Sequence, residues 1–227
     1  NYRINLKNEH TLKSTDDYFV KFGVEQVDNS FLHAVSYCLG LSVEKIRSNI
    51  TKALKSKIGN SIFSSINQGK IRRMFNNVDE YIDYINKSNQ TVEISYMSHI
   101  CELPNILYKE GLQFIIFHRR FYNVIENNEN KKRDEFFIDT NTQYPIVSSI
   151  PTIILLVEYN NIYPIVKINK ELKSSKIKIQ KYFIMDKMND CKQLFKYIGN
   201  YIKMSNHPNI IEKLYLQDKT KKWTADY

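Results

Sequence analysis

The chain has 227 residues, of which 42 % are hydrophobic and 25 % are charged, and its formal net charge is +9. A chain of this length and composition can bury a core without disulfide or metal staples, and six Gly and five Pro exclude a flexible linker protein. The basic excess can attract nucleic acid, although a general preference for lysine explains it more simply.

Cysteine usage and hydropathy restrict the compartment. Cys38, Cys101 and Cys191 are far apart in the sequence and form no CxxC pair, which predicts a reducing compartment without a disulfide framework. The sequence shows no signal peptide and no apolar run of bilayer length, so we expect no membrane partner. The chain begins with Asn rather than Met, which indicates a processed product or a segment of a longer protein.

The first half of the chain is predicted to be mainly helical. Residues 1–17 are polar and unpatterned, and "YFVKFGVEQ" then alternates as a strand does. A helix is expected to begin at Ser30 and stop at Gly40, followed by a second helix that Ser42 caps. Two or three short helices follow over residues 58–88. The next helix covers residues 97–108, where Pro104 favours a bend.

The second half is predicted to consist mainly of strands. "LQFIIFHRRFYNVI" indicates a buried strand and "ENNENKKRDE" a charged hairpin tip. "FFIDT", "TIILLVEY" and "YPIVKI" indicate further strands, the last two joined as a hairpin, and "KIKIQKYFIM" adds one or two more. The order of elements predicts an α+β fold with a central mixed or antiparallel sheet flanked by helices. We divide the chain into a polar segment (1–17), a main domain (18–185) and a C-terminal helical extension that packs on it (186–227).

Motif searches leave one candidate for chemistry. The sequence has no Gly-rich phosphate loop, paired His/Cys metal motif or GxSxG elbow, so we expect neither a cofactor nor a metal. Ser30 stands where a helix is expected to begin, a place that suits a nucleophile but equally suits a capping serine, and we favour the cap. Asp28 and Asn29 fit an oxyanion hole or a tight turn, and we favour the turn. His33 and His99 are most simply structural.

The candidate stretch resembles a known family. "DNSFLHAVSYCLG" is similar to the nucleophile segment of ovarian-tumour (OTU) cysteine peptidases. In that pattern Asn29 matches the family's Asn, Phe31-Leu32 its apolar pair, His33 its basic residue and Ala34 its Ala. Ser30 stands where the catalytic Cys would be.

Two later segments extend the resemblance over roughly residues 18–168. "ISYMSHICELPNILYKEGLQFIIF" resembles the family's helix with a Glu-Leu pair, here Glu102-Leu103, and "TIILLVEYNNIYPIVKI" resembles its closing hairpin. Tyr163 matches the family's Tyr, and Ile162 stands where the catalytic His would be. Since Ser and Ile supply neither a thiolate nor a base, the resemblance implies an OTU-like fold without catalysis. An active or weakly active deubiquitinase-like hydrolase and a ubiquitin-binding pseudoenzyme remain as alternatives.

A further resemblance concerns "FGVEQVDNSFLHAV", which looks like a segment of large-DNA-virus proteins related to the large subunit of the viral early transcription factor. It implies a non-catalytic interaction or scaffold domain tied to early transcription. The implied partners are other viral subunits or the rest of its own polypeptide, with nucleic acid or ubiquitin as alternatives. The implied location is the host cytoplasm, in the viral factory, or the virion.

Clusters of basic residues beside aromatic residues predict a nucleic-acid or partner surface, although solvated helix ends and loop tips explain them as well. The candidate residues are Arg72, Arg73, Arg119, Arg120, Lys131, Lys132 and Arg133.

Overall fold

The computed structural model describes residues 2–3, 17–23, 30–87, 94–126, 129–138, 149–159, 161–170 and 177–184. Over residues 120–126 and 129–138 it describes the backbone alone. The predicted extension (186–227), most of the polar segment (1–17), and Asp28 and Asn29 lie outside the described residues.

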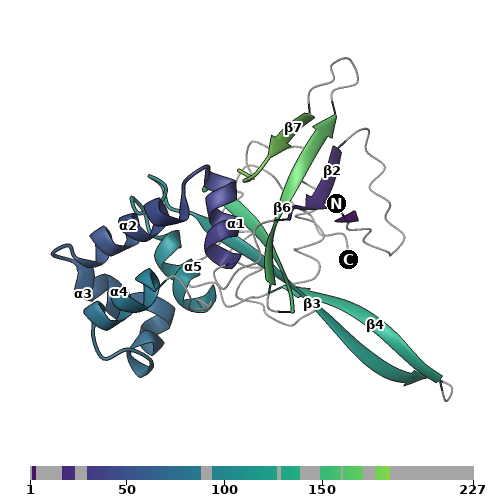
Figure 1. Ribbon diagram of the computed structural model, residues 1–227, viewed down its shortest axis with the longest axis horizontal. Coiled ribbons are helices and arrows are strands. Elements are labelled where there is room, and N and C mark those ends of the chain that lie inside the picture. Colours follow the sequence, from purple (N-terminus) through teal and green to yellow (C-terminus); the bar gives the residue numbers. More distant parts are fainter. Residues whose placement is uncertain are drawn as a thin grey trace, which may run out of the picture.

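The described helices follow one another in the chain between β2 and β3, and they gather on one side of a mixed sheet (Figure 1). This confirms the predicted α+β fold with a mixed sheet flanked by helices. The helical elements are α1 (Ser30–Leu39), α2 (Val43–Leu54), α3 (Gly59–Ser65), the 3-10 helix η1 (Ile66–Arg73), α4 (Val78–Asn86) and α5 (Ile94–Glu102). The strands are β1 (Tyr2–Arg3), β2 (Asp17–Lys21), β3 (Gln113–Glu126), β4 (Glu129–Ile138), β5 (Thr152–Glu158), β6 (Asn161–Lys170) and β7 (Ile177–Gln180).

The sheet has the strand order β1-β2-β6-β5-β3-β4, and β7 also pairs with β6. Strands β3 and β5 are parallel, and the other pairs are antiparallel. The predicted hairpin is confirmed, because β5 turns directly into β6 with Glu158 opposite Asn161. The short strand β1 falls in the segment that the sequence left unpatterned, since two residues are too few to show alternation.

Local signals set several helix ends. The Ser42 side chain accepts a hydrogen bond from Lys45 N at 3.2 Å, which confirms the predicted cap of α2. Asn77 caps α4 in the same way, accepting from Glu80 N at 2.9 Å. Helix α1 stops at Gly40, which adopts a φ of 67°, a conformation that glycine adopts without steric cost.

Two predicted elements were wrong in their limits. Helix α5 ends at Glu102 instead of continuing to residue 108, because the ring of Pro104 cannot be accommodated within a regular helix. The charged stretch predicted as a hairpin tip is largely strand, since β4 begins at Glu129 and pairs with β3 along its whole length. Charged side chains are common on edge strands, so a charged stretch does not by itself indicate a turn. The prediction from polarity therefore put the turn in the wrong place.

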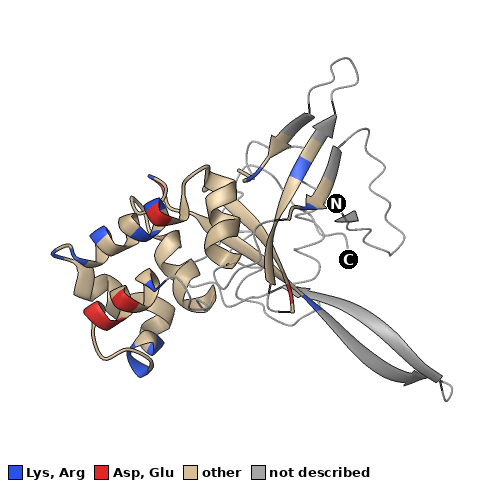
Figure 2. Ribbon diagram, in the orientation of Figure 1, with Lys and Arg blue, Asp and Glu red and all other residues tan. Residues whose placement is uncertain are grey.

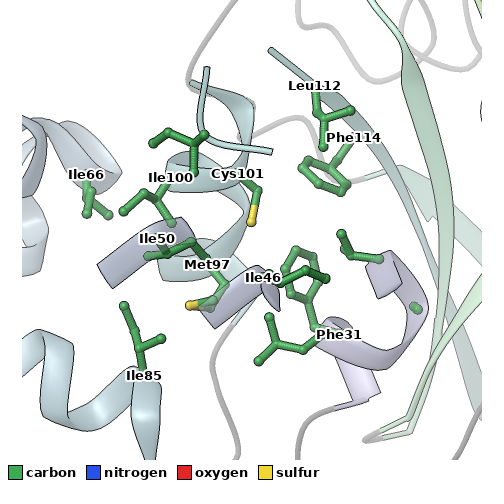
Figure 3. Packing of buried hydrophobic residues seen from close by; sticks show 14 of the residues in the cluster. Phe31, Ile46, Ile50, Ile66, Ile85, Met97, Ile100, Cys101, Leu112 and Phe114 are labelled. Carbon is green, nitrogen blue, oxygen red and sulfur yellow. The ribbon is translucent and has the colours of Figure 1, made fainter. Parts of the chain in front are cut away.

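The core lies between the helices and one face of the sheet. In Figure 3, Phe31 of α1, Ile46 and Ile50 of α2, and Met97 of α5 lie in one apolar cluster with Phe114 at the start of β3. Phe114, Ile116, Ile153, Leu155 and Ile162 supply the sheet side of this cluster. The alternate strand positions Ile115, Ile154, Leu156 and Ile165 are buried as well. A sheet buried at both sets of positions reads as continuous apolar runs, as "TIILLV" does.

Candidate functional site

The structure brings together the two positions that the resemblance singled out. Ser30 begins α1, and Ile162 lies near the start of β6, 132 residues further along the chain. Ile162 N donates a hydrogen bond to Ser30 Oγ across 3.3 Å. Helix α1 packs along β6, so this contact joins the helical layer to the sheet beside the β5–β6 turn.

This junction is closed and chemically neutral. Ser30 and Ile162 are each only 6 % exposed, and the Ile162 side chain belongs to the apolar core. A serine hydroxyl needs a strong base before it can attack a carbonyl, and an isoleucine supplies none. The hydrogen bond recorded for Ser30 reaches β6, so the predicted role as a cap of its own helix is corrected to a link between layers.

Among the described residues, no histidine forms a hydrogen bond with Ser30. In the part of the chain that the structure describes, the Ser30 hydroxyl bonds Ile162 and no imidazole. His99 is buried on α5, where its Nδ1 accepts a hydrogen bond from Asn67 N at 2.8 Å. His118 pairs with Val157, which pairs with Ile162, so the backbone of His118 lies two strands and about 10 Å from Ile162.

His99 stabilises an unusual turn. Within η1, Asn67, Gln68 and Gly69 all have positive φ angles, of 50°, 55° and 83°. Two successive non-glycine residues in this region cost free energy that the surrounding structure must offset. The bond from Asn67 N to a buried imidazole supplies part of that offset, which supports the structural reading of His99.

A charged cluster that the sequence did not predict lies beside the β5–β6 turn. Glu158, the last residue of β5, is 8 % exposed and forms ion pairs with Lys21 of β2 and with Arg119 of β3. Arg119 Nη1 lies 2.7 Å from Glu158 Oε1, and Lys21 bonds the other carboxylate oxygen. The Lys21 ammonium also lies 4.5 Å from the centre of the Tyr163 ring. The cluster ties together three strands that are distant in the sequence.

Two opposing effects act on the Glu158 carboxyl. Burial by itself raises its pKa, but the hydrogen bonds and positive charges of Lys21 and Arg119 outweigh burial and lower the pKa below its ordinary value. Glu158 is therefore ionised at neutral pH and acts as a structural anion. A signal was available in the sequence, because a carboxylate that ends a buried apolar strand requires a partner.

The predicted basic residues occupy separate parts of the fold. Arg72 and Arg73 are exposed on η1, where Arg72 donates a hydrogen bond to Ser64 Oγ. In Figure 2 the basic residues of the helical part lie among acidic ones. Arg119, which was predicted for a binding surface, forms an ion pair with Glu158, and its side chain is 31 % exposed. The backbones of Arg120, Lys131, Lys132 and Arg133 lie in the β3–β4 hairpin, and their side chains lie outside the described residues.

A second buried carboxyl lies at the end of α5. Glu102 Oε2 is buried without a hydrogen-bond partner among the described residues. Burial raises the pKa of Glu102 to about 8.

The described residues hold no group of three or more His, Cys, Asp or Glu side chains arranged to bind a metal ion. Nor do they include a helix whose length and hydropathy would allow it to cross a bilayer.

Comparison with known proteins gives a viral relative. No protein-family model matches the chain. The chain is 30 % identical over 184 residues to a protein of Acanthamoeba polyphaga mimivirus described as "Uncharacterized protein R327". The match covers 78 % of this chain but only 12 % of the mimivirus protein. The chain is therefore similar to a limited part of a much longer viral polypeptide.

Proposed function

We propose that this chain is a non-catalytic, OTU-like interaction or scaffold domain of a larger viral protein. The observation that carries the proposal is the Ser30–Ile162 junction. The resemblance assigns these two residues to the Cys and His positions of a peptidase, and they lie in direct hydrogen-bond contact. A site in which both catalytic positions are replaced and buried has kept an architecture without its chemistry.

The larger context is supported by the comparison. The mimivirus relative is about eight times as long as the region that it shares with this chain, which suits one domain among several. The link to early transcription rests on the resemblance of "GVEQVDNSFLHAV" to the viral transcription-factor relatives. The proposed location is a viral factory or the virion, both reached from the cytoplasm. Cys38 and Cys101 are free, buried thiols, which suits a reducing compartment. Burial raises the pKa of both thiols.

The alternatives of a hydrolase and a ubiquitin-binding pseudoenzyme are separated by one set of experiments. The unmodified protein is incubated with a fluorogenic ubiquitin substrate and titrated with ubiquitin by calorimetry. We expect neither turnover nor binding. Turnover by the unmodified protein refutes the non-catalytic proposal, and binding without turnover identifies a ubiquitin-binding pseudoenzyme.

A gain-of-function variant tests the architecture itself. In Ser30→Cys with Ile162→His, a thiol and an imidazole occupy the two positions that the structure joins. Labelling by an electrophilic ubiquitin probe in this double variant, but not in the control Ser36→Cys on the same helix, supports the OTU-like assignment. Equal labelling of both variants contradicts it, because it reports thiol reactivity without site geometry.

Nucleic-acid binding is a second candidate because Arg72 and Arg73 are exposed next to each other on η1. Arginines that neutralise phosphates release the counterions bound to the nucleic acid. If Arg72 and Arg73 bind nucleic acid, the affinity for it should therefore fall steeply as the salt concentration rises. The double variant Arg72→Ala plus Arg73→Ala should then weaken binding of a single-stranded oligonucleotide and reduce the salt slope. Lys55→Ala plus Lys57→Ala, in the exposed loop after α2, is the matched control. Equal effects of the two pairs exclude a dedicated surface.

A further inference from the structure

The far part of the β3–β4 hairpin leaves the body of the sheet. Pairing between β3 and β5 ends where Arg119 lies opposite Glu158. Strands β3 and β4 continue to pair for seven more positions, from Arg120 opposite Glu135 to Glu126 opposite Glu129. Figure 1 shows this two-stranded ribbon extending well beyond the rest of the fold.

Such a ribbon is incomplete as an isolated structure. Two strands in water are marginally stable, and an unpaired strand edge presents N–H and C=O groups that another strand can bind. Among the strands that the structure describes, β4 ends the sheet and pairs with β3 alone. No described strand pairs with the outer edge of these ten residues.

The charges of β4 indicate which strand fits this edge. Residues 131–135 read Lys-Lys-Arg-Asp-Glu, so the two residues before Arg133 are positive and the two after it are negative. In an antiparallel pair, residues directly opposite each other share a face of the sheet, and opposite charges there are favourable. A second β4 that runs antiparallel about a two-fold axis at Arg133 places Lys132 opposite Asp134 of the second copy, and Lys131 opposite Glu135 of the second copy.

We propose that β4 pairs antiparallel with β4 of a second copy, centred on Arg133, and joins the two sheets into one. Symmetry repeats both charge pairs, so four opposite-charge pairs form. Arg133 lies opposite Arg133 of the second copy at the axis, and this one like-charge pair opposes the four favourable pairs, with Glu135 of the second copy as a diagonal neighbour of opposite charge. The two domains lie at opposite ends of the joined ribbons, which keeps them clear of each other. The isologous contact closes after two copies and so limits assembly to a dimer.

The ribbon is poorly suited to nucleic acid as the alternative partner. Glu126, Glu129, Asp134 and Glu135 lie in the same ribbon as the basic residues. Acidic residues interspersed at this frequency repel phosphates, whereas antiparallel self-pairing uses two of them, Asp134 and Glu135.

The test measures the mass of the 227-residue chain, 27.0 kDa as a monomer, by light scattering after size exclusion over a range of concentrations. We expect the unmodified chain to have twice the monomer mass at high concentration. The acidic variant Lys131→Glu plus Lys132→Asp, and the basic variant Asp134→Lys plus Glu135→Lys, should each be monomeric because like charges then lie opposite each other. An equimolar mixture of the two variants should restore the doubled mass.

Matched controls remove the effect of net charge. Lys55→Glu plus Lys57→Asp changes the net charge as the acidic variant does, and Asp83→Lys plus Glu110→Lys changes it as the basic variant does. Both control chains should stay dimeric. A monomeric unmodified chain overturns the proposal, as does a mixture of the acidic and basic variants that remains monomeric although both variants are folded by circular dichroism. Retention of the dimer in either single variant also overturns it.

Discussion

The ends of β5 and α5 each carry a buried glutamate, and the fold treats the two in opposite ways. Glu158 at the end of β5 has Lys21 and Arg119 as partners, and its pKa is lowered. Glu102 at the end of α5 has a buried oxygen without a partner among the described residues, and burial raises its pKa to about 8. Burial is common to both, so the partners determine whether a buried carboxyl is ionised at neutral pH.

The two glutamates also differ in what each does in the fold. The Glu158 cluster joins β2, β3 and β5 next to the turn that presents Ile162 to Ser30. It therefore helps to hold the Ser30–Ile162 junction in place. The Glu102 carboxyl changes charge near neutral pH, because burial raises its pKa to about 8. Its pKa therefore depends on how well the end of α5 excludes water.

The largest effect is expected from removing the anion of the charged cluster. Glu158→Gln leaves Lys21 and Arg119 without a counter-charge and should lower the free energy of unfolding by about 3 kcal/mol at pH 7. The measurement is urea unfolding followed by circular dichroism. The control is Glu110→Gln, at an exposed position, which should change little.

Acid should reproduce this loss in the unmodified chain. Because the pKa of Glu158 is lowered on folding, its contribution is present above the ordinary carboxyl pKa and is lost as the pH falls through the lowered value. The stability difference between the unmodified chain and Glu158→Gln should therefore shrink below about pH 4. A difference that stays constant down to pH 2 would contradict an ionic role for Glu158.

The opposite pH dependence is expected at the end of α5. Since folding raises the pKa of Glu102, the folded state holds its proton more tightly, and stability falls as the pH rises from the ordinary carboxyl pKa to about 8. Glu102→Gln should be about 2 kcal/mol more stable than the unmodified chain at pH 8.5 and nearly equal to it at pH 5. Urea unfolding at the two pH values measures this, and a loss of stability at both would show that the carboxylate has a partner.

A smaller effect should distinguish the two cations of the cluster. The side chain of Lys21 is 15 % exposed and that of Arg119 is 31 % exposed, so water screens the arginine more. Lys21→Met should cost about 1.5 kcal/mol and Arg119→Met less, because exposed ion pairs contribute little. A double-mutant cycle with Glu158→Gln measures each coupling, and a stronger coupling for Arg119 would reverse this order.

The smallest effect is expected at the neutral junction. Ser30→Ala removes the acceptor of the buried Ile162 N–H and should cost about 1 kcal/mol in thermal unfolding. Ser36→Ala, which removes a hydroxyl bonded to Leu41 O on the same helix, provides the comparison. If Ser30→Ala is neutral while Ser36→Ala is not, the junction is held by packing and not by its hydrogen bond.

Much of the local structure could be predicted from residue order. Capping residues act within one turn, so Ser42 marked the start of α2 and Gly40 the end of α1. A continuous apolar run and the Tyr-Asn-Asn turn marked β5 and its hairpin partner β6. The failures were also local, since a proline shortened α5 and charges disguised β4 as a loop.

By itself the sequence determined where most of the described helices and strands form, and that Ser30 and Ile162 stand at the positions where the resemblance has Cys and His. The tertiary structure alone decided which distant residues meet. Ser30 faces Ile162, and Glu158 joins Lys21 to Arg119, because strands distant in the chain lie side by side in the sheet. The two glutamates show the reason: a carboxyl has the same intrinsic pKa in any sequence, and only its neighbours in space determine its charge.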